Sequence, residues 1–167
     1  EQAYSFWFKN VQSNWRYLMN YANASTTRFS IVLNTINPKE IGVIGSSGCL
    51  NCNASGGFNN FNSPGLHIGW HHIAVTISLS TYSVYYDGTL ISTEPHAGFN
   101  CIDPTFRFIL GNDILCSPEY YNMYLDDIAV WNRSLTECEI QELYAGTIIT
   151  STDNQTACDS YTWIDGN

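Results

Sequence analysis

The feature that most constrains this chain is a succession of short strand-like segments that no helical period interrupts before residue 135. In "AYSFWFK", strict alternation places Tyr4, Phe6 and Phe8 on one face of a strand. Similar segments follow in order: "WRYLMNYA", "RFSIVLN", "IGVIG", "HHIAVTIS", "YSVYYDGTLIS", "FRFILG" and "YLDDIAVW". The succession predicts an all-β fold, an antiparallel β-sandwich.

Turn and loop signals separate these segments. Asp87-Gly88 predicts a hairpin with a type I′ turn, because both central residues of that turn need positive φ. Residues 45–66 are rich in Gly, Asn and Ser and contain few apolar residues. We therefore expect a loop without regular structure over 45–66.

One short C-terminal helix follows the strands. Thr136 and Glu139 form a capping box, in which each side chain bonds the backbone N–H of the other. Ile140 and Tyr144 lie at helical spacing, and Gly146 is suited to end the helix. We expect this helix to cover one end or edge of the sandwich.

Charge and length exclude several classes of protein. The net charge is −9, and the six basic residues are scattered among 15 acidic ones. Binding to nucleic acid and binding to anionic membrane surfaces are therefore excluded. No apolar run reaches the roughly 20 residues of a membrane span, and no membrane insertion is expected. With Glu1 first and no signal peptide, a mature product or an excised fragment is expected. The composition changes near residue 150, which predicts a domain over 1–150 and a linker or following repeat over 151–167.

Six cysteines are many for a cytosolic chain of this length. Only "CLNC" has the two-residue gap of a zinc knuckle, and the sequence has no second pair with this spacing, so a zinc site is disfavoured. Disulfides in an oxidising compartment are favoured. Cys49 with Cys52, and Cys101 with Cys116, could each close a loop, but the connectivity stays open. The cysteines are Cys49, Cys52, Cys101, Cys116, Cys138 and Cys158.

Four segments in this order resemble the laminin G-like domain of the concanavalin A-like lectin/glucanase fold: "GWHHIAVTIS", "YSVYYDGTLI", "FILGND" and "YLDDIAVWNRSLTECEIQELYAG". The resemblance covers residues 4 to about 150 and implies a jelly-roll sandwich that is secreted or displayed at a cell surface. The family usually has a further strand before "SFWFK", so that strand is missing here or that edge of the sandwich is incomplete. "TACDSYTWIDGN" resembles the opening of a repeat in large multidomain bacterial surface proteins.

Asp126 and Asp127 are the acidic residues of the last strand segment. Strand alternation places Asp126 in phase with Ile128 and Val130, which predicts that Asp126 points to the interior and Asp127 to the other face. Such a pair cannot flank one scissile bond, and the chain lacks the closely alternating acidic residues of the fold's hydrolases. The resemblance implies that Asp126 helps to hold a structural calcium. Its alternative is a carboxylate bonded only by backbone or hydroxyl groups.

Asp113 and three histidines are further candidate metal ligands. Asp113 is a second candidate calcium ligand, by its loop position after "FILG". His71 and His72 are neighbours on a strand and His67 lies apart, so core packing is favoured over a metal site.

Sugar binding requires exposed aromatic rings beside polar side chains, because sugar C–H faces stack on aromatic rings and hydroxyls need directional partners. The candidate ligand-binding residues are Trp7, Trp15, Tyr85, Tyr120 and Asn112.

The predicted function is non-catalytic recognition of glycans or extracellular protein partners in an adhesin-like protein, beside neighbouring domains of the same chain. A structural spacer is the alternative. An accessory domain of a polysaccharide-degrading enzyme, or a hydrolase or lyase, comes third.

Overall fold

The computed structural model describes residues 1–10, 16–23, 26–34, 40–51, 58–62, 69–95, 105, 107–113, 119–120 and 123–146. Within them, two five-stranded antiparallel sheets pack face to face. The predicted antiparallel β-sandwich with a short C-terminal helix is confirmed. Neither the predicted boundary near residue 150 nor residues 151–167 fall within the described part of the chain.

The first sheet has the order β12-β1-β6-β7-β8, and the second has the order β5-β4-β3-β2-β9. The strands of the first sheet are β1 (Gln2–Asn10), β6 (Trp70–Ile77), β7 (Thr81–Tyr86), β8 (Thr89–Pro95) and β12 (Met123–Trp131). The strands of the second are β2 (Arg16–Ala22), β3 (Thr26–Asn34), β4 (Glu40–Asn51), β5 (Phe58–Asn62) and β9 (Arg107–Leu110). The remaining elements are β10 (Asn112–Asp113), β11 (Glu119–Tyr120) and α1 (Glu137–Ala145).

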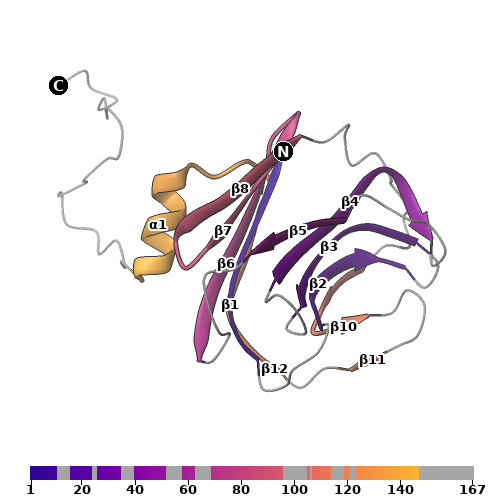
Figure 1. The fold of residues 1–167 in the computed structure, drawn as a ribbon, viewed down its shortest axis with the longest axis horizontal. Coiled ribbons are helices and arrows are strands. Elements are labelled where there is room, and N and C mark those ends of the chain that lie inside the picture. Colours follow the sequence, from indigo (N-terminus) through magenta and orange to yellow (C-terminus); the bar gives the residue numbers. More distant parts are fainter. Residues whose placement is uncertain are drawn as a thin grey trace.

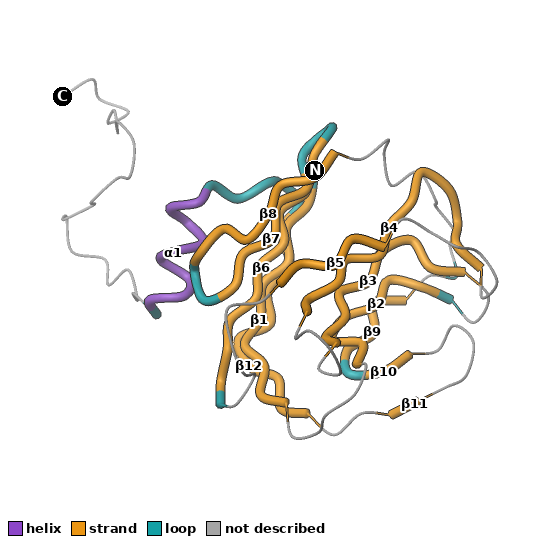
Figure 2. Tube along the Cα trace, viewed as in Figure 1, coloured by secondary structure: helices purple, strands orange, loops and turns teal. Residues whose placement is uncertain are grey.

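The elements form three layers. Figure 1 shows the first sheet between the second sheet and α1, and Figure 2 shows that α1 is the helix in an otherwise strand-built fold. Within the described residues, no helix combines the length and apolar character that crossing a membrane requires.

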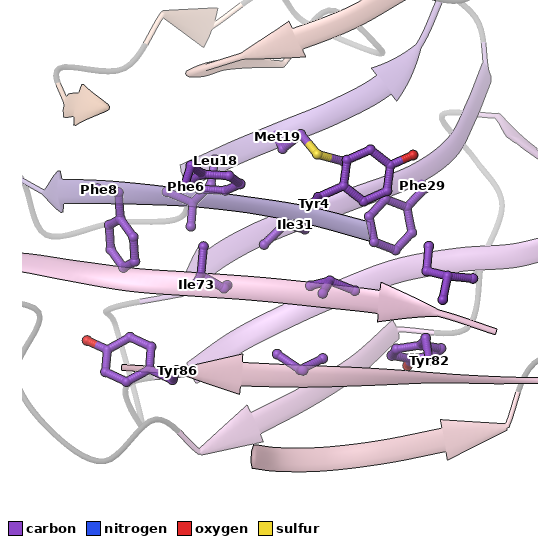
Figure 3. Packing of buried hydrophobic residues seen from close by; sticks show 13 residues of the cluster. Tyr4, Phe6, Phe8, Leu18, Met19, Phe29, Ile31, Ile73, Tyr82 and Tyr86 are labelled. Carbon is purple, nitrogen blue, oxygen red and sulfur yellow. The ribbon is translucent and has the colours of Figure 1, made fainter. Parts of the chain in front are cut away.

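The inter-sheet core follows from the alternation on β1. Tyr4, Phe6 and Phe8 are buried between the sheets, where Tyr4 stacks on Phe29 of β3 at 5.5 Å between ring centroids (Figure 3). Ile73 of β6 belongs to the same cluster. The side chains of alternate residues of β1 and β6 therefore form the contact between the two sheets.

The outer face of the first sheet is covered by α1. Ile140, the fully buried helix residue, packs against Ala3, Ala74 and Tyr85 of three adjacent strands. Small alanines let the helix approach the sheet closely. The prediction that the helix covers an end or edge was wrong, because these apolar outward-facing residues give α1 a face to cover.

The helix itself has the predicted ends. The Thr136 hydroxyl accepts the Glu139 N–H at 3.3 Å, and the Glu139 carboxylate accepts the Thr136 N–H at 2.8 Å. Gly146 ends α1 with φ of 64°. Arg133 binds the Glu139 carboxylate through two hydrogen bonds and lowers its pKa to about 2.

The Asp87-Gly88 turn also matches the prediction, with φ of 48° and 73°. The Asp87 carboxylate then accepts the His72 backbone N–H at 2.8 Å and contacts the His71 Nδ1 at 2.8 Å. Both oxygens are therefore used at the start of β6. A Cβ added at Gly88 would lie 2.8 Å from Cδ1 of Tyr144, so the turn also packs against the helix.

The loop expected over residues 45–66 was wrong in part. β4 continues to Asn51, which pairs with Thr26, and β5 pairs with β4 from Ile44 opposite Phe58. Hydrogen bonding to neighbouring strands stabilises a segment whose composition alone favours a loop. Such pairing depends on the register with the preceding and following strands, which local composition does not reveal.

We expect Gly88→Ala to lower the free energy of unfolding by about 2–3 kcal/mol, because it adds backbone strain at positive φ and a contact with Tyr144. Urea unfolding measures the change. Gly146→Ala is the matched control, since its φ is 64° and nothing lies within 4 Å of an added Cβ. The control should lose only the strain, about 1 kcal/mol. Equal losses in the two variants would contradict a close contact between turn and helix.

Candidate functional site

The strand register places three residues in one line across the outer face of the first sheet. Lys9 of β1 is opposite Trp70 on β6 and Tyr124 on β12. Its neighbour Phe8 points into the core, so Lys9 points outward. We call Trp70, Lys9 and Tyr124 the aromatic row.

The aromatic row lies where the helix no longer covers the sheet. Tyr144, near the end of α1, stacks on Trp7 at 5.6 Å between ring centroids. The next residue of β1 on the same face is Lys9. Beside it, Trp70 of β6 is 43% exposed and Tyr124 of β12 is 58% exposed. Their ring centroids are 6.4 Å apart with planes inclined at 54°, and the Lys9 Nζ lies 6.0 Å from the Tyr124 ring centroid. Two large rings and one ammonium group therefore face outward together.

A β-bulge on β12 sets the position of the two aspartates. Ser5 is opposite Ala129, whereas Trp7 is opposite Asp126, so β12 has one extra residue here. Asp127 has φ of 47°, and its N–H donates to the Asp126 Oδ1 at 2.9 Å.

This bulge corrects the prediction for Asp126. Its side chain is exposed, and because it is opposite Trp7 it shares the outer face with the aromatic row. The predicted interior position was wrong because strand alternation changes phase at the extra residue. Asp127 is also exposed, and its charge acts on the outward-facing His72. The expectation that Asp127 points to the other face from Asp126 stays a prediction.

His72 lies beside Trp7 on the neighbouring strand, and its ring contacts Tyr144 of α1. It is 1% exposed, and its Nε2 forms a hydrogen bond of 2.6 Å with the Ser5 hydroxyl. Its Nδ1 is buried and has no hydrogen-bond partner within the described residues. Burial lowers the pKa of His72 to about 4, although the charges of Asp87 and Asp127 act to raise it. His72 is therefore neutral at pH 7.

The packing role expected for the His-His pair is confirmed. His71 stacks on Tyr86 at 5.1 Å between ring centroids, while His72 is buried on the opposite face of β6. His67 falls outside the described residues.

The predicted ligand-binding residues do not gather in one place. Trp7 is half-buried beside the aromatic row, under Tyr144. Tyr85 is only 6% exposed and packs beneath α1, so its prediction as an exposed ring was wrong. Asn112 is half-buried in β10, and its Oδ1 has no partner among the described atoms. Trp15 and the side chains of Asp113 and Tyr120 lie outside the described part.

Sequence reasoning missed Trp70 and Tyr124. Both stand at the start of strand segments, where they precede residues that pack in the core or under the helix. The usable signal was Lys9, which alternation on β1 places on the outer face. Residues opposite Lys9 on the two adjacent strands share that face. Using that signal required knowing that β1 lies between β6 and β12.

Calcium binding was predicted at Asp126 and Asp113. Calcium takes six to eight oxygen ligands. Among the described residues, no group of three or more His, Cys, Asp or Glu side chains could hold a metal ion. Calcium at Asp126 or Asp113 stays a prediction.

Comparison with known proteins identifies the fold. A laminin G-like family model, described as the concanavalin A-like lectin/glucanases superfamily, matches residues 1–141. A search of curated proteins found no match. The match agrees with the resemblance inferred from the four strand segments.

Solved structures share the architecture at low sequence identity. The SAP-like pentraxin of Limulus polyphemus is 17% identical with a TM-score of 0.69, covering 89% of this chain and 71% of its own. A structure of botulinum neurotoxin type C, whose cell entry depends on interaction with two ganglioside molecules, is 16% identical with a TM-score of 0.61, covering 87% of this chain. The binding domain of botulinum neurotoxin DC in complex with rat synaptotagmin II is 14% identical with a TM-score of 0.62, covering 89% of this chain. This chain spans 35% and 36% of those two neurotoxin chains, and these likenesses establish the fold alone.

We expect acid to destabilise the protein through His72. Because the pKa of His72 is about 4 when folded and 6.5 when unfolded, the unfolded state binds more protons between these values. Stability is therefore full above pH 6.5 and falls as the pH drops towards 4, by about 2 kcal/mol between pH 7 and pH 5. Urea unfolding at both pH values measures the loss.

The control for this experiment is His72→Gln, which keeps a polar side chain beside Ser5 but does not titrate. Glu139 does not interfere, since its contribution is lost only below its usual pKa of 4.5. An equal pH dependence in the wild type and His72→Gln would contradict a buried neutral histidine.

Proposed function

The chain belongs to the concanavalin A-like lectin/glucanases superfamily, and on that premise we propose that it is a non-catalytic extracellular module that binds glycans at the aromatic row. The single observation that carries this proposal is the exposed pair of Trp70 and Tyr124, 6.4 Å apart beyond the end of the helix cover.

The chemistry of the aromatic row suits a sugar. Pyranose C–H faces stack on aromatic rings, and the large faces of Trp and Tyr supply this contact at little cost in conformational entropy. Asp126 is exposed on the same face and can accept hydrogen bonds from sugar hydroxyls. Lys9 is a donor between the rings. Hydrophobic faces beside donors and acceptors are what sugar recognition needs.

Relatives in fold support a recognition role. The type C neurotoxin depends on gangliosides for cell entry, and the neurotoxin DC binding domain is in complex with synaptotagmin II. Both are binding functions, to a glycolipid in one protein and to a protein in the other. We favour a glycan for this chain because the outer face combines paired rings with single charges of both signs.

An oxidising, extracellular location is part of the same proposal. Cys138, at the second residue of α1, is disulfide-bonded. Disulfides persist mainly in secreted and surface proteins. The pairs suggested by sequence, Cys49 with Cys52 and Cys101 with Cys116, lie outside the described side chains.

A glycan array, probed with and without calcium, tests the proposal. We expect binding that Trp70→Ala and Tyr124→Ala each weaken about five- to tenfold, as stacking contacts of about 1–1.5 kcal/mol are lost. Leu79→Ala is the control: Leu79 is 82% exposed on the turn after β6, at the opposite end from Trp70, and should bind as the wild type does. Melting curves check that each variant folds.

Two outcomes would count against the proposal. No glycan binding in either condition favours the structural spacer, or a protein partner if the aromatic row is needed for one. Glycan binding that survives both aromatic substitutions places the site elsewhere on the chain.

Calcium is tested separately by thermal unfolding with and without a chelator. If Asp126 helps to hold calcium, the chelator should lower the midpoint, because a ligand that binds only the folded state stabilises it. Asp126→Asn should lower the midpoint in calcium and abolish the response to the chelator. An unchanged wild-type midpoint would contradict the calcium prediction.

A further inference from the structure

We propose that the aromatic row selects glycans carrying a carboxylated sugar unit, with Lys9 binding the carboxylate. The inference rests on the proposed glycan-binding function and names its ligand class. It is carried by the position and charge of Lys9 between Trp70 and Tyr124.

Lys9 has an ammonium group without a neutralising partner in the described part of the chain. The ion pairs there join His71 with Asp87 and Arg133 with Glu139. No described carboxylate lies within 4 Å of the Lys9 Nζ, which instead lies 6.0 Å from the Tyr124 ring centroid. In a chain with only six basic residues and a net charge of −9, this cation stands among aromatic rings.

The geometry lets one sugar use both kinds of contact. Lys9 is the middle residue of the aromatic row, so a ring stacked on Trp70 or Tyr124 places its substituents above Lys9. A carboxylate substituent there forms a charge-assisted hydrogen bond with the ammonium group. Such bonds are roughly twice as strong as those between neutral groups.

The aspartates restrict the ligand further. Asp126 is the next outward-facing residue after Tyr124, about 7 Å along β12. It repels a second anionic group but accepts hydrogen bonds from hydroxyls. One carboxylate among hydroxyls therefore fits this face better than a densely sulfated chain, in which like charges would meet Asp126 and Asp127.

Matched ligands test the inference by calorimetry. One pair is a disaccharide ending in glucuronic acid and its glucose counterpart, and the other is sialyllactose and lactose. We expect the wild type to prefer the acid in at least one pair by about tenfold, the effect of one charge-assisted hydrogen bond, and to lose this preference as salt rises. Heparin should bind no better than the preferred acid.

Substitutions assign the preference to Lys9. Lys9→Gln should weaken binding of the acid about tenfold more than binding of the neutral sugar and so remove the preference, because only the acid loses a charge-assisted hydrogen bond. Lys9→Arg should keep it. Arg107→Gln is the matched control, since Arg107 is an exposed cation on the second sheet. It should bind as the wild type does.

The failures of the two proposals are distinguishable. Equal binding of acid and neutral sugars, or a preference that Lys9→Gln retains, overturns the role of Lys9. If glycan binding in that case still depends on Trp70 and Tyr124, the proposed function is retained. If no sugar binds, both proposals fall.

Discussion

Burial of β6 on both faces is the constraint on which the rest of the structure depends. Ile73 and Val75 join the inter-sheet core on one side, while His72 and Ala74 lie against the layer that includes α1 on the other. On a strand covered on both sides an unpartnered polar group is costly, so most polar groups there are hydrogen-bonded. Ser5 bonds the His72 ring and Asp87 accepts the His72 N–H. Sheet, turn and helix therefore meet at one short segment of β6.

The candidate site is defined by where this cover stops. Tyr144 packs on Trp7 and against Gly88, and it ends the helical layer over β1. Beside Lys9, the next outward-facing residue of β1, Trp70 is 43% exposed and Tyr124 is 58% exposed. The same packing that buries His72 therefore leaves the aromatic row available to a ligand.

Local features of the chain were predictable because they depend on neighbouring residues. The Asp87-Gly88 turn needs positive φ at two successive positions, and the Thr136 capping box needs two residues three apart. The alternation of Tyr4, Phe6 and Phe8 likewise needs only regular strand geometry. The prediction from alternation failed at Asp126 because β12 has a bulge at Asp127 in its pairing with β1, 120 residues away in sequence. The prediction of Tyr85 as a site residue failed because α1, a distant part of the sequence, packs over this side chain.

The sequence by itself determined most strands of the two sheets, the hairpin turn, the ends of the helix and the resemblance to a laminin G-like domain, since each is encoded in short segments. Only the tertiary structure decided which aromatic residues are exposed. Trp7, Trp70, Tyr85 and Tyr124 are chemically alike, and their exposure depends on what another layer places above them. The same holds for Lys9, whose two ring neighbours come from strands 61 and 115 residues further along the chain. Contacts between residues so far apart in sequence are set by sheet order and register, which the residue pattern within one strand does not contain.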